Sequence, residues 1–236
     1  MSFTRWLLNR ACPLAIPLLA APALASAQTI TAGACSSDGQ PPPSVLVERF
    51  LPDNCAQCWA RPIRAADLAA FTVDWIVPGT DTDAPLAAAA LPEATGRLAA
   101  LGYTPDTAEP QFWKWRHPVA GNAPAGRLRV AHGPAVNEYV GVSIAWTPTH
   151  AGKRPLDAWL LLVEELPAGT EGSPSPRRLV RGAFSIPASA ADKDGWTERR
   201  SMRIPPGADA SRLQVVGWLA DNRGRMLMSA ASRCPR

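Results

Sequence analysis

Histidine and cysteine are scarce in this chain, and they form no complete metal-binding motif. The 236 residues include three histidines and five cysteines, with one C-x-x-C and no H-x-x-x-H. Typical zinc sites combine two such closely spaced pairs. The single pair would have to be completed by Cys35, Cys234, His117, His132 or His150. We therefore expect no metal site and no cofactor, and a zinc site is kept as the minor alternative.

Three other functional features are also missing. After residue 27, no stretch approaches the ~20 apolar residues that span a bilayer. The formal charge is only +4, and short basic pairs at Arg177–Arg178 and Arg199–Arg200 are typical of solvated strand edges rather than of a continuous basic face. No G-x-S-x-G occurs. We expect no membrane span after signal cleavage, no nucleic-acid partner and no serine-hydrolase chemistry.

The N-terminus has the features of an export signal. Arg5 and Arg10 accompany an apolar run over 11–24, and residues 25–27 match an A-x-A cleavage site. We predict cleavage after residue 27 and a periplasmic or secreted protein. The segment holds two arginines and no acid, so its removal lowers the formal charge from +4 to +2.

Four cysteines remain in the predicted mature chain: Cys35, Cys55, Cys58 and Cys234. An even number in an oxidising compartment predicts two disulfides, for which three pairings are open. The simplest pairing joins Cys55 to Cys58 and Cys35 to Cys234. The second bond would close a loop of about 200 residues, which restricts the unfolded chain by about 4–5 kcal/mol in the entropic description.

The N-terminal half reads as alternating strands and helices. We expect a linker over 28–43, a strand over 45–51, a helix over 55–70, a strand over 71–77 and a helix over 84–101. Asp53 or Asn54 can cap the first helix, and Pro62 lies early enough in it to cost little or to produce a modest kink. Strand, helix and strand form a βαβ unit with parallel strands.

The C-terminal half has the pattern of strands separated by turns. Seven strand-like runs are present, at 127–132, 138–146, 157–165, 178–186, 198–204, 212–220 and 225–231. Residues 167–176 form a surface loop, and residues 221–224 form a hairpin turn. This number of strands predicts a β-sandwich-like half.

Several motifs resemble an uncharacterised family of secreted bacterial proteins with an N-terminal thioredoxin-like domain. Residues 45–50 (VLVERF) followed by residues 55–58 (CAQC) are similar to the family's opening, residues 73–75 (VDW) and 103–105 (YTP) to later elements, and residues 214–227 to the closing hairpin. The resemblance implies an α/β thioredoxin-like domain over 44–126 and a β-rich, sandwich-like domain over 127–236. It also implies a cis-proline facing the dithiol, for which Pro105 and Pro134 are candidates. Trp59 stands where the family usually has proline.

The C-x-x-C has three interpretations. As a redox site, Cys55 would be the attacking thiolate, favoured by the start of the helix, and Cys58 would resolve the mixed disulfide. Arg61 and Arg64 would add positive potential, whereas Asp53 would oppose them. As a structural element, the pair would be a static disulfide that braces the turn. As a metal ligand pair, it would need partners from elsewhere in the chain.

Other candidate functional residues are one carboxylate and two tryptophans. Asp74 lies in an apolar strand, where a buried carboxylate with a raised pKa could relay protons; a hydrogen-bonded structural aspartate is the alternative. Trp113 and Trp115 could line a peptide or sugar groove, or occupy the buried face of a strand. The Glu164–Glu165 pair reads as solvated charges at a strand end.

Two functions follow as hypotheses. The first is thiol–disulfide exchange through Cys55 and Cys58, with other exported proteins as partners through mixed disulfides. The second is a non-catalytic binding or structural module of the cell envelope, stabilised by disulfides and presenting the tryptophan-rich segment 111–118.

Overall fold

β-strands dominate the part of the chain that the computed structural model describes. That part comprises residues 34–103, 112–119, 126–149, 156–187 and 195–235. The predicted export signal over 1–27 lies outside it. Residues Ala32–Arg236 form one unit by themselves.

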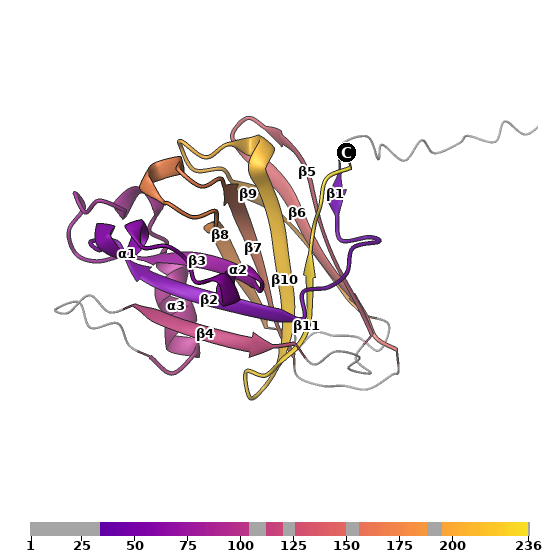
Figure 1. Cartoon of the computed structure of the whole chain (residues 1–236). Helices are drawn as coiled ribbons and strands as arrows, with labels where there is room; N and C mark the ends of the chain where they lie inside the picture. Colours follow the sequence, from indigo (N-terminus) through magenta and orange to yellow (C-terminus); the bar gives the residue numbers. More distant parts are fainter. Residues whose placement is uncertain (1–33, 104–111, 120–125, 150–155, 188–194, 236) are drawn as a thin grey trace, which may run out of the picture. The chain divides into compact units, whose positions relative to one another are not determined.

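The strands form two sheets (Figure 1). The larger has the order β11-β10-β7-β8-β3-β2-β4 and consists of β2 (Val45–Pro52), β3 (Phe71–Val77), β4 (Trp113–Pro118), β7 (Leu156–Leu166), β8 (Arg177–Pro187), β10 (Leu213–Asp221) and β11 (Met226–Ala231). The smaller has the order β1-β5-β6-β9 and consists of β1 (Cys35–Ser36), β5 (Arg127–Val136), β6 (Tyr139–Thr147) and β9 (Trp196–Arg203). The seven strands predicted beyond residue 126 are confirmed as β5 to β11.

The helices are shorter than the sequence pattern predicts. Those of the described residues are α1 (Ala56–Ala60), α2 (Ala65–Leu68) and α3 (Pro92–Ala100). The single helix expected over 55–70 is wrong, because Arg61 is extended (φ −75°, ψ 136°), the backbone that a following proline favours, so α1 ends before Pro62. Of the helix expected over 84–101, only the second half is present, because α3 begins at Pro92 and is preceded by a short 3-10 turn over Ala87–Ala89.

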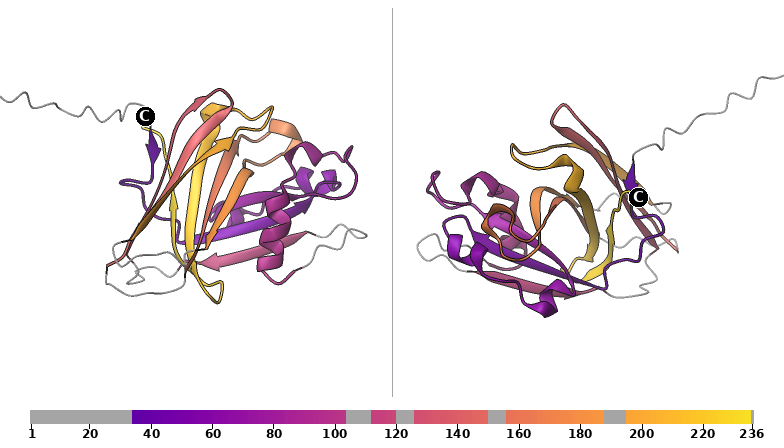
Figure 2. Two further views of the ribbon diagram at one scale, coloured as in Figure 1. Left: turned by 180° about the vertical axis from the view of Figure 1, so that it is seen from behind. Right: turned by 45° about the horizontal axis from the view of Figure 1, so that its top comes forward.

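Hydrophobic side chains cover both faces of the larger sheet. On β7, Leu160 and Leu162 share a core cluster with side chains of β5 and β6, whereas Leu161 and Val163 belong to a cluster that includes residues of β2, β3 and α3. This explains the uninterrupted apolar run in β7, because a strand buried on both faces does not alternate. Figures 1 and 2 show β2 to β4 and the helices on one side of β7 and β10, and β5 and β6 on the other.

The prediction of an α/β thioredoxin-like fold for the N-terminal half is wrong. β2 and β3 do pair in parallel, with Leu46 opposite Phe71, as a βαβ unit requires. However, β3 also pairs in parallel with β8, where Asp74 lies opposite Leu179. The backbone groups on the second edge of β3 are thereby bonded to a C-terminal strand, and both halves contribute to one mostly β structure. The division of the chain at residue 127 stays a prediction.

Candidate functional site

The Cys55–Cys58 bond lies directly after β2, in a turn fixed by Asp53. The Asp53 N–H donates to the Val77 carbonyl (3.0 Å), and its buried carboxylate accepts the Gly79 N–H (2.6 Å). A Cβ at position 79 would lie 2.8 Å from Asp53 Oδ1, which explains the glycine. Asp53 therefore joins the ends of the two parallel strands and does not cap α1.

The residue that caps α1 is Cys55 itself. Its Sγ accepts the Cys58 N–H at 3.2 Å, and the two cysteines are joined by a disulfide, as predicted. Both side chains are half-buried. α1 has only five residues, so the helix that begins at this cysteine is much shorter than predicted. The N–H at its first turn reaches Cys55 Sγ, and nearby cations can add to its effect on a Cys55 thiolate.

A cavity of about 350 Å³ opens beside Cys58 and has a largely cationic lining. Its walls are formed by Cys58, Arg49, Arg61, Pro62, Arg64, Asp67, Phe112 and Lys114. Arg49 and Lys114 come together because they are directly opposed in the antiparallel β2–β4 pair. The break at Pro62 brings the segment between α1 and α2 into the wall.

Two acidic groups neutralise part of this charge. Asp67 lies 3.2 Å from Lys114 Nζ. Asp74 is fully buried and accepts from Arg49 Nε at 2.6 Å and from Arg177 Nη1 at 3.4 Å. The proton-relay role suggested for Asp74 stays a prediction, and the structure places it between two guanidinium groups.

Arg177 holds α1 in place through hydrogen bonds to the backbone and a contact with the Trp59 ring. Its Nη2 donates to the carbonyls of Trp59 and, at 3.0 Å, of Arg61, and its guanidinium carbon lies 4.2 Å from the centroid of the Trp59 ring. Burial lowers the pKa of Arg177, an effect that Asp74 opposes. The interpretation of Arg177 as a solvated strand-edge residue is wrong, whereas Arg199 and Arg200 are exposed on the edge strand β9.

The sequence contained a weak signal for this buried charge network. Glu48 and Arg49 interrupt an otherwise apolar strand, and Asp74 interrupts the next one. Adjacent charges of opposite sign in two parallel strands require partners if both strands are buried. Nothing in the sequence pattern indicated that Arg177 would supply one of them.

A second buried ion cluster lies around Glu48. Arg97 of α3 donates from Nη2 to Glu48 Oε2 at 2.6 Å and from Nε to Oε1 at 3.0 Å, and His117 Nε2 lies 2.9 Å from Oε2. Full burial would raise the pKa of Glu48, but Arg97 and His117 outweigh it and lower the pKa to about 2. This cluster attaches α3 to the sheet.

A third buried carboxylate belongs to Glu164, which was expected to be solvated. Glu164 is buried and lies 2.6 Å from Arg181 Nη2, so its interpretation as a solvated strand-end charge is wrong. Glu165 is exposed and pairs with Arg178 at 3.1 Å, as the sequence pattern suggested.

Trp113 and Trp115 are half-buried on β4 and pack against the core cluster around Phe50. The ring of Trp115 makes edge contacts with Phe50 (6.2 Å between centroids) and with Tyr103 (4.5 Å). Packing on one face of a strand is therefore confirmed. Ligand binding by these tryptophans stays a prediction.

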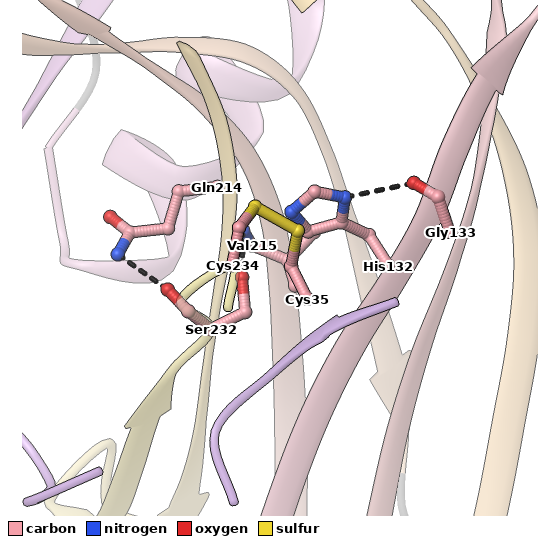
Figure 3. Close-up of a disulfide and its surroundings, with 7 residues drawn as sticks. All are labelled: Cys35, His132, Gly133, Gln214, Val215, Ser232 and Cys234. Carbon is pink, nitrogen blue, oxygen red and sulfur yellow. Dashed lines mark hydrogen bonds between the residues drawn. A yellow bond between two sulfur atoms is a disulfide. The ribbon is translucent and has the colours of Figure 1, made fainter. Parts of the chain in front are cut away.

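The predicted Cys35–Cys234 disulfide is also present and joins sites 199 residues apart (Figure 3). Cys35 of β1 lies opposite His132 of β5, whose Nδ1 is 3.1 Å from the Gly133 carbonyl. Burial lowers the pKa of His132. Cys35, His132 and Cys234 could be ligands by distance, but the disulfide occupies both sulfur atoms.

No other group of three potential metal ligands is found within the described ranges, so none there includes Cys55 or Cys58. Neither cis-proline candidate is supported as one by the described residues. Pro134 has a trans peptide bond, and Pro105, like His150, lies outside them.

No helix in the described segments has the length and apolarity to cross a membrane. From its sheets and its two cysteine bonds, the chain is a mostly β module stabilised by two disulfides.

Comparison with known proteins gives no family. No family model and no curated protein matches the chain. Among solved structures, HBP35 of Porphyromonas gingivalis aligns with 80% of this chain and 74% of its own, at 11% identity and a TM-score of 0.47. An endonuclease/exonuclease/phosphatase from Beutenbergia cavernae aligns with 53% of this chain and 31% of its own, at 12% identity and a TM-score of 0.28. Neither similarity carries a functional argument, and the family resemblance of the C-x-x-C segment stays a prediction.

Proposed function

We propose that this chain is an exported protein that exchanges thiols and disulfides with other exported proteins through Cys55 and Cys58. The observation that carries the proposal is the position of this half-exposed disulfide at the wall of a cationic cavity. Structural disulfides in protein cores offer no such access to a partner thiol. The two disulfides also fit an oxidising periplasmic or extracellular compartment.

The exchange needs a partner dithiol and transfers two electrons. A partner thiolate attacks one sulfur of the Cys55–Cys58 bond, the S–S bond breaks, and the other sulfur leaves with the electron pair as a thiolate. The second partner thiol loses its proton and attacks the partner's own sulfur in the mixed disulfide. That S–S bond breaks, and the cysteine of this chain leaves with the electron pair as a thiolate. The partner is thereby oxidised to a disulfide, and Cys55 and Cys58 are reduced.

The surroundings of the pair favour its anionic reduced state. The Cys58 N–H that reaches Cys55 Sγ at 3.2 Å would stabilise a thiolate on Cys55. Arg61 and Arg64 are exposed at the same cavity and have no acidic partner among the described residues. Positive charge near a cysteine lowers the pKa of its thiol and makes the reduced form a better nucleophile at neutral pH.

The test is a redox titration of the full chain with alkylation and mass-spectrometric detection of each cysteine. We expect Cys55–Cys58 to be reduced at a markedly more oxidising potential than Cys35–Cys234, which is the internal reference. We also expect a Cys58→Ser variant to retain a mixed disulfide on Cys55. If Cys55–Cys58 is no easier to reduce than Cys35–Cys234, the exchange function is rejected.

A second candidate is a binding or structural module without exchange chemistry. The observation that favours it is the firm attachment of α1, since Trp59 Nε1 donates to the Glu171 carbonyl at 2.7 Å in addition to the contacts with Arg177. A brace of this kind would keep the disulfide closed. In the same titration, this function predicts a poorly reducible pair and no trapped mixed disulfide.

A further inference from the structure

We propose that the cavity beside Cys55–Cys58 selects exchange partners whose reacting cysteine is flanked by carboxylates, so that the preferred partner is an acidic peptide segment. This inference rests on the proposed exchange function and adds the chemical class of the partner. It is argued from the charges of the cavity wall, from their placement, and from the donors that remain available there.

The charge of the wall is strongly unbalanced. Four of its side chains are cationic (Arg49, Arg61, Arg64 and Lys114), and one is acidic (Asp67). The carboxylate behind the wall, Asp74, does not restore the balance, because it is shared with the guanidinium of Arg177. Cationic groups therefore outnumber acidic groups at and directly behind the wall, and the cavity attracts anions.

The cations have two distinct roles. Arg49 is held in place, because its Nε and Nη2 both bond to the buried Asp74, and within the described part of the chain its Nη1 has no acceptor. Arg61 and Arg64 are exposed, and neither has an acidic partner in the described segments. One fixed guanidinium and two adaptable ones suit a carboxylate, which accepts paired hydrogen bonds from arginine.

The position of the cavity links this charge to the chemistry. Cys58 is part of the wall, so a group bound in the cavity lies next to one of the two residues of the disulfide. A volume of about 350 Å³ accommodates one or two side chains of a partner rather than a folded surface. An acidic residue close in sequence to the partner cysteine would enter the cavity as the sulfur reaches the disulfide.

The experiment measures the rate at which oxidised full-length protein reacts with three cysteine peptides of equal length. The cysteine is flanked by glutamate, by glutamine or by lysine, and the scored product is the mixed disulfide that the peptide forms when it opens the Cys55–Cys58 bond. At low ionic strength we expect the glutamate peptide to react at least about tenfold faster than the lysine peptide, with the glutamine peptide between them. The difference should narrow at 0.5 M salt, because ions screen exposed charges.

Two double variants locate the effect. Arg61→Gln with Arg64→Gln should slow the glutamate peptide by about tenfold more than the glutamine peptide at low salt. The glutamine peptide slows only through the weaker stabilisation of the leaving thiolate. The matched control is Arg199→Gln with Arg223→Gln, which removes the same charge at exposed positions outside the cavity wall. The control should not alter the preference among peptides.

The outcomes separate the inference from the function. Equal rates for the three peptides, or equal effects of the two double variants, would overturn the acidic preference and leave exchange intact. No reaction with any peptide would overturn exchange. In that case, binding of the same peptides with serine in place of cysteine decides the cavity's preference, and glutamate binding no better than lysine would reject it. A small thiol that carries carboxylates is tested in the same way. If it reacts as fast as the glutamate peptide, carboxylate recognition is supported, but the partner is assigned as a small thiol instead of a peptide.

Discussion

Glu48 is a carboxylate removed completely from water, and its ionisation depends on Arg97 and His117. Such a group is stable only with partners, because an isolated buried charge costs several kcal/mol. The bidentate contact from Arg97 explains why α3 is attached at this point of the sheet. Because the pKa of Glu48 is lowered in the folded chain, this residue makes the free energy of unfolding depend on pH.

We expect acid to remove the contribution of Glu48 to stability. Its pKa is about 2 in the folded chain, below the ordinary 4.5, so the unfolded chain binds a proton first as the pH falls. The contribution is full above pH 4.5, is lost between pH 4.5 and 2, and amounts to roughly 3 kcal/mol. Urea unfolding at a series of pH values measures it.

The control for this dependence is Glu48→Gln, which mimics the protonated residue. Its free energy of unfolding should lie roughly 3 kcal/mol below the parent at pH 7 and approach the parent near pH 2. A constant difference between the two proteins across this range would contradict the assignment.

Arg177 is a second residue whose burial decides its role. Replacing it in Arg177→Met removes a partner of Asp74 and the Nη2 group that donates to the carbonyls of Trp59 and Arg61, so we expect a loss of about 3 kcal/mol in unfolding free energy. The adjacent Arg178→Met, which removes a half-exposed pair with Glu165, should cost less than about 1 kcal/mol. Similar losses in the two variants would show that Arg177 does not anchor α1.

At the scale of elements, the fold depends on the break between α1 and α2 and on the close packing of the two sheets. Pro62 separates α1 from α2 and directs the intervening segment into the cavity wall, which a continuous helix over 55–70 would not allow. Gly217 on β10 faces the four-stranded sheet, where a Cβ would lie 2.8 Å from Val130 Cγ1 and 2.9 Å from Ile144 Cδ1. The absence of a side chain there permits the observed packing of one sheet on the other.

We expect Gly217→Ala to destabilise the protein by about 1–3 kcal/mol, since the added methyl group would force the two sheets apart. Gly141→Ala on β6 is the matched control, because a Cβ there meets no atom within 4 Å. Its unfolding free energy should change by no more than about 0.5 kcal/mol. Chemical denaturation compares the two, and equal effects would exclude close sheet packing as the reason for Gly217.

At the scale of the whole molecule, the two disulfides differ in the length of chain that they close. Cys35–Cys234 spans 199 residues and joins β1 to the segment after β11, whereas Cys55–Cys58 spans three. Loop-closure entropy grows with the logarithm of loop length. The long-range bond is therefore the main covalent source of stability, and the short one is available for chemistry.

Removing the bonds separately tests this division. Cys35→Ser with Cys234→Ser should lower the unfolding free energy by about 5 kcal/mol, and Cys55→Ser with Cys58→Ser by about 1–2 kcal/mol. Urea titrations of both double variants provide the comparison. A larger loss for the Cys55 and Cys58 variant would mean that the short bond is primarily structural.

The sequence by itself determined the local features. The strands β5 to β11 follow from apolar runs between turn residues, and the two disulfides follow from four cysteines with one close pair. These signals lie within a few neighbouring residues or in a simple count, so no knowledge of distant contacts is needed.

Only the tertiary structure decided how those elements combine. The pairing of β3 with β8 placed both halves in one sheet, and it replaced the expected thioredoxin-like half. The burial of Glu48, Glu164 and Arg177, and the meeting of Arg49 with Lys114 beside Cys58, depend on the same arrangement. A charged side chain reads as solvated until its distant partner is known, because burial is favourable only when opposite charges and hydrogen bonds come together in space.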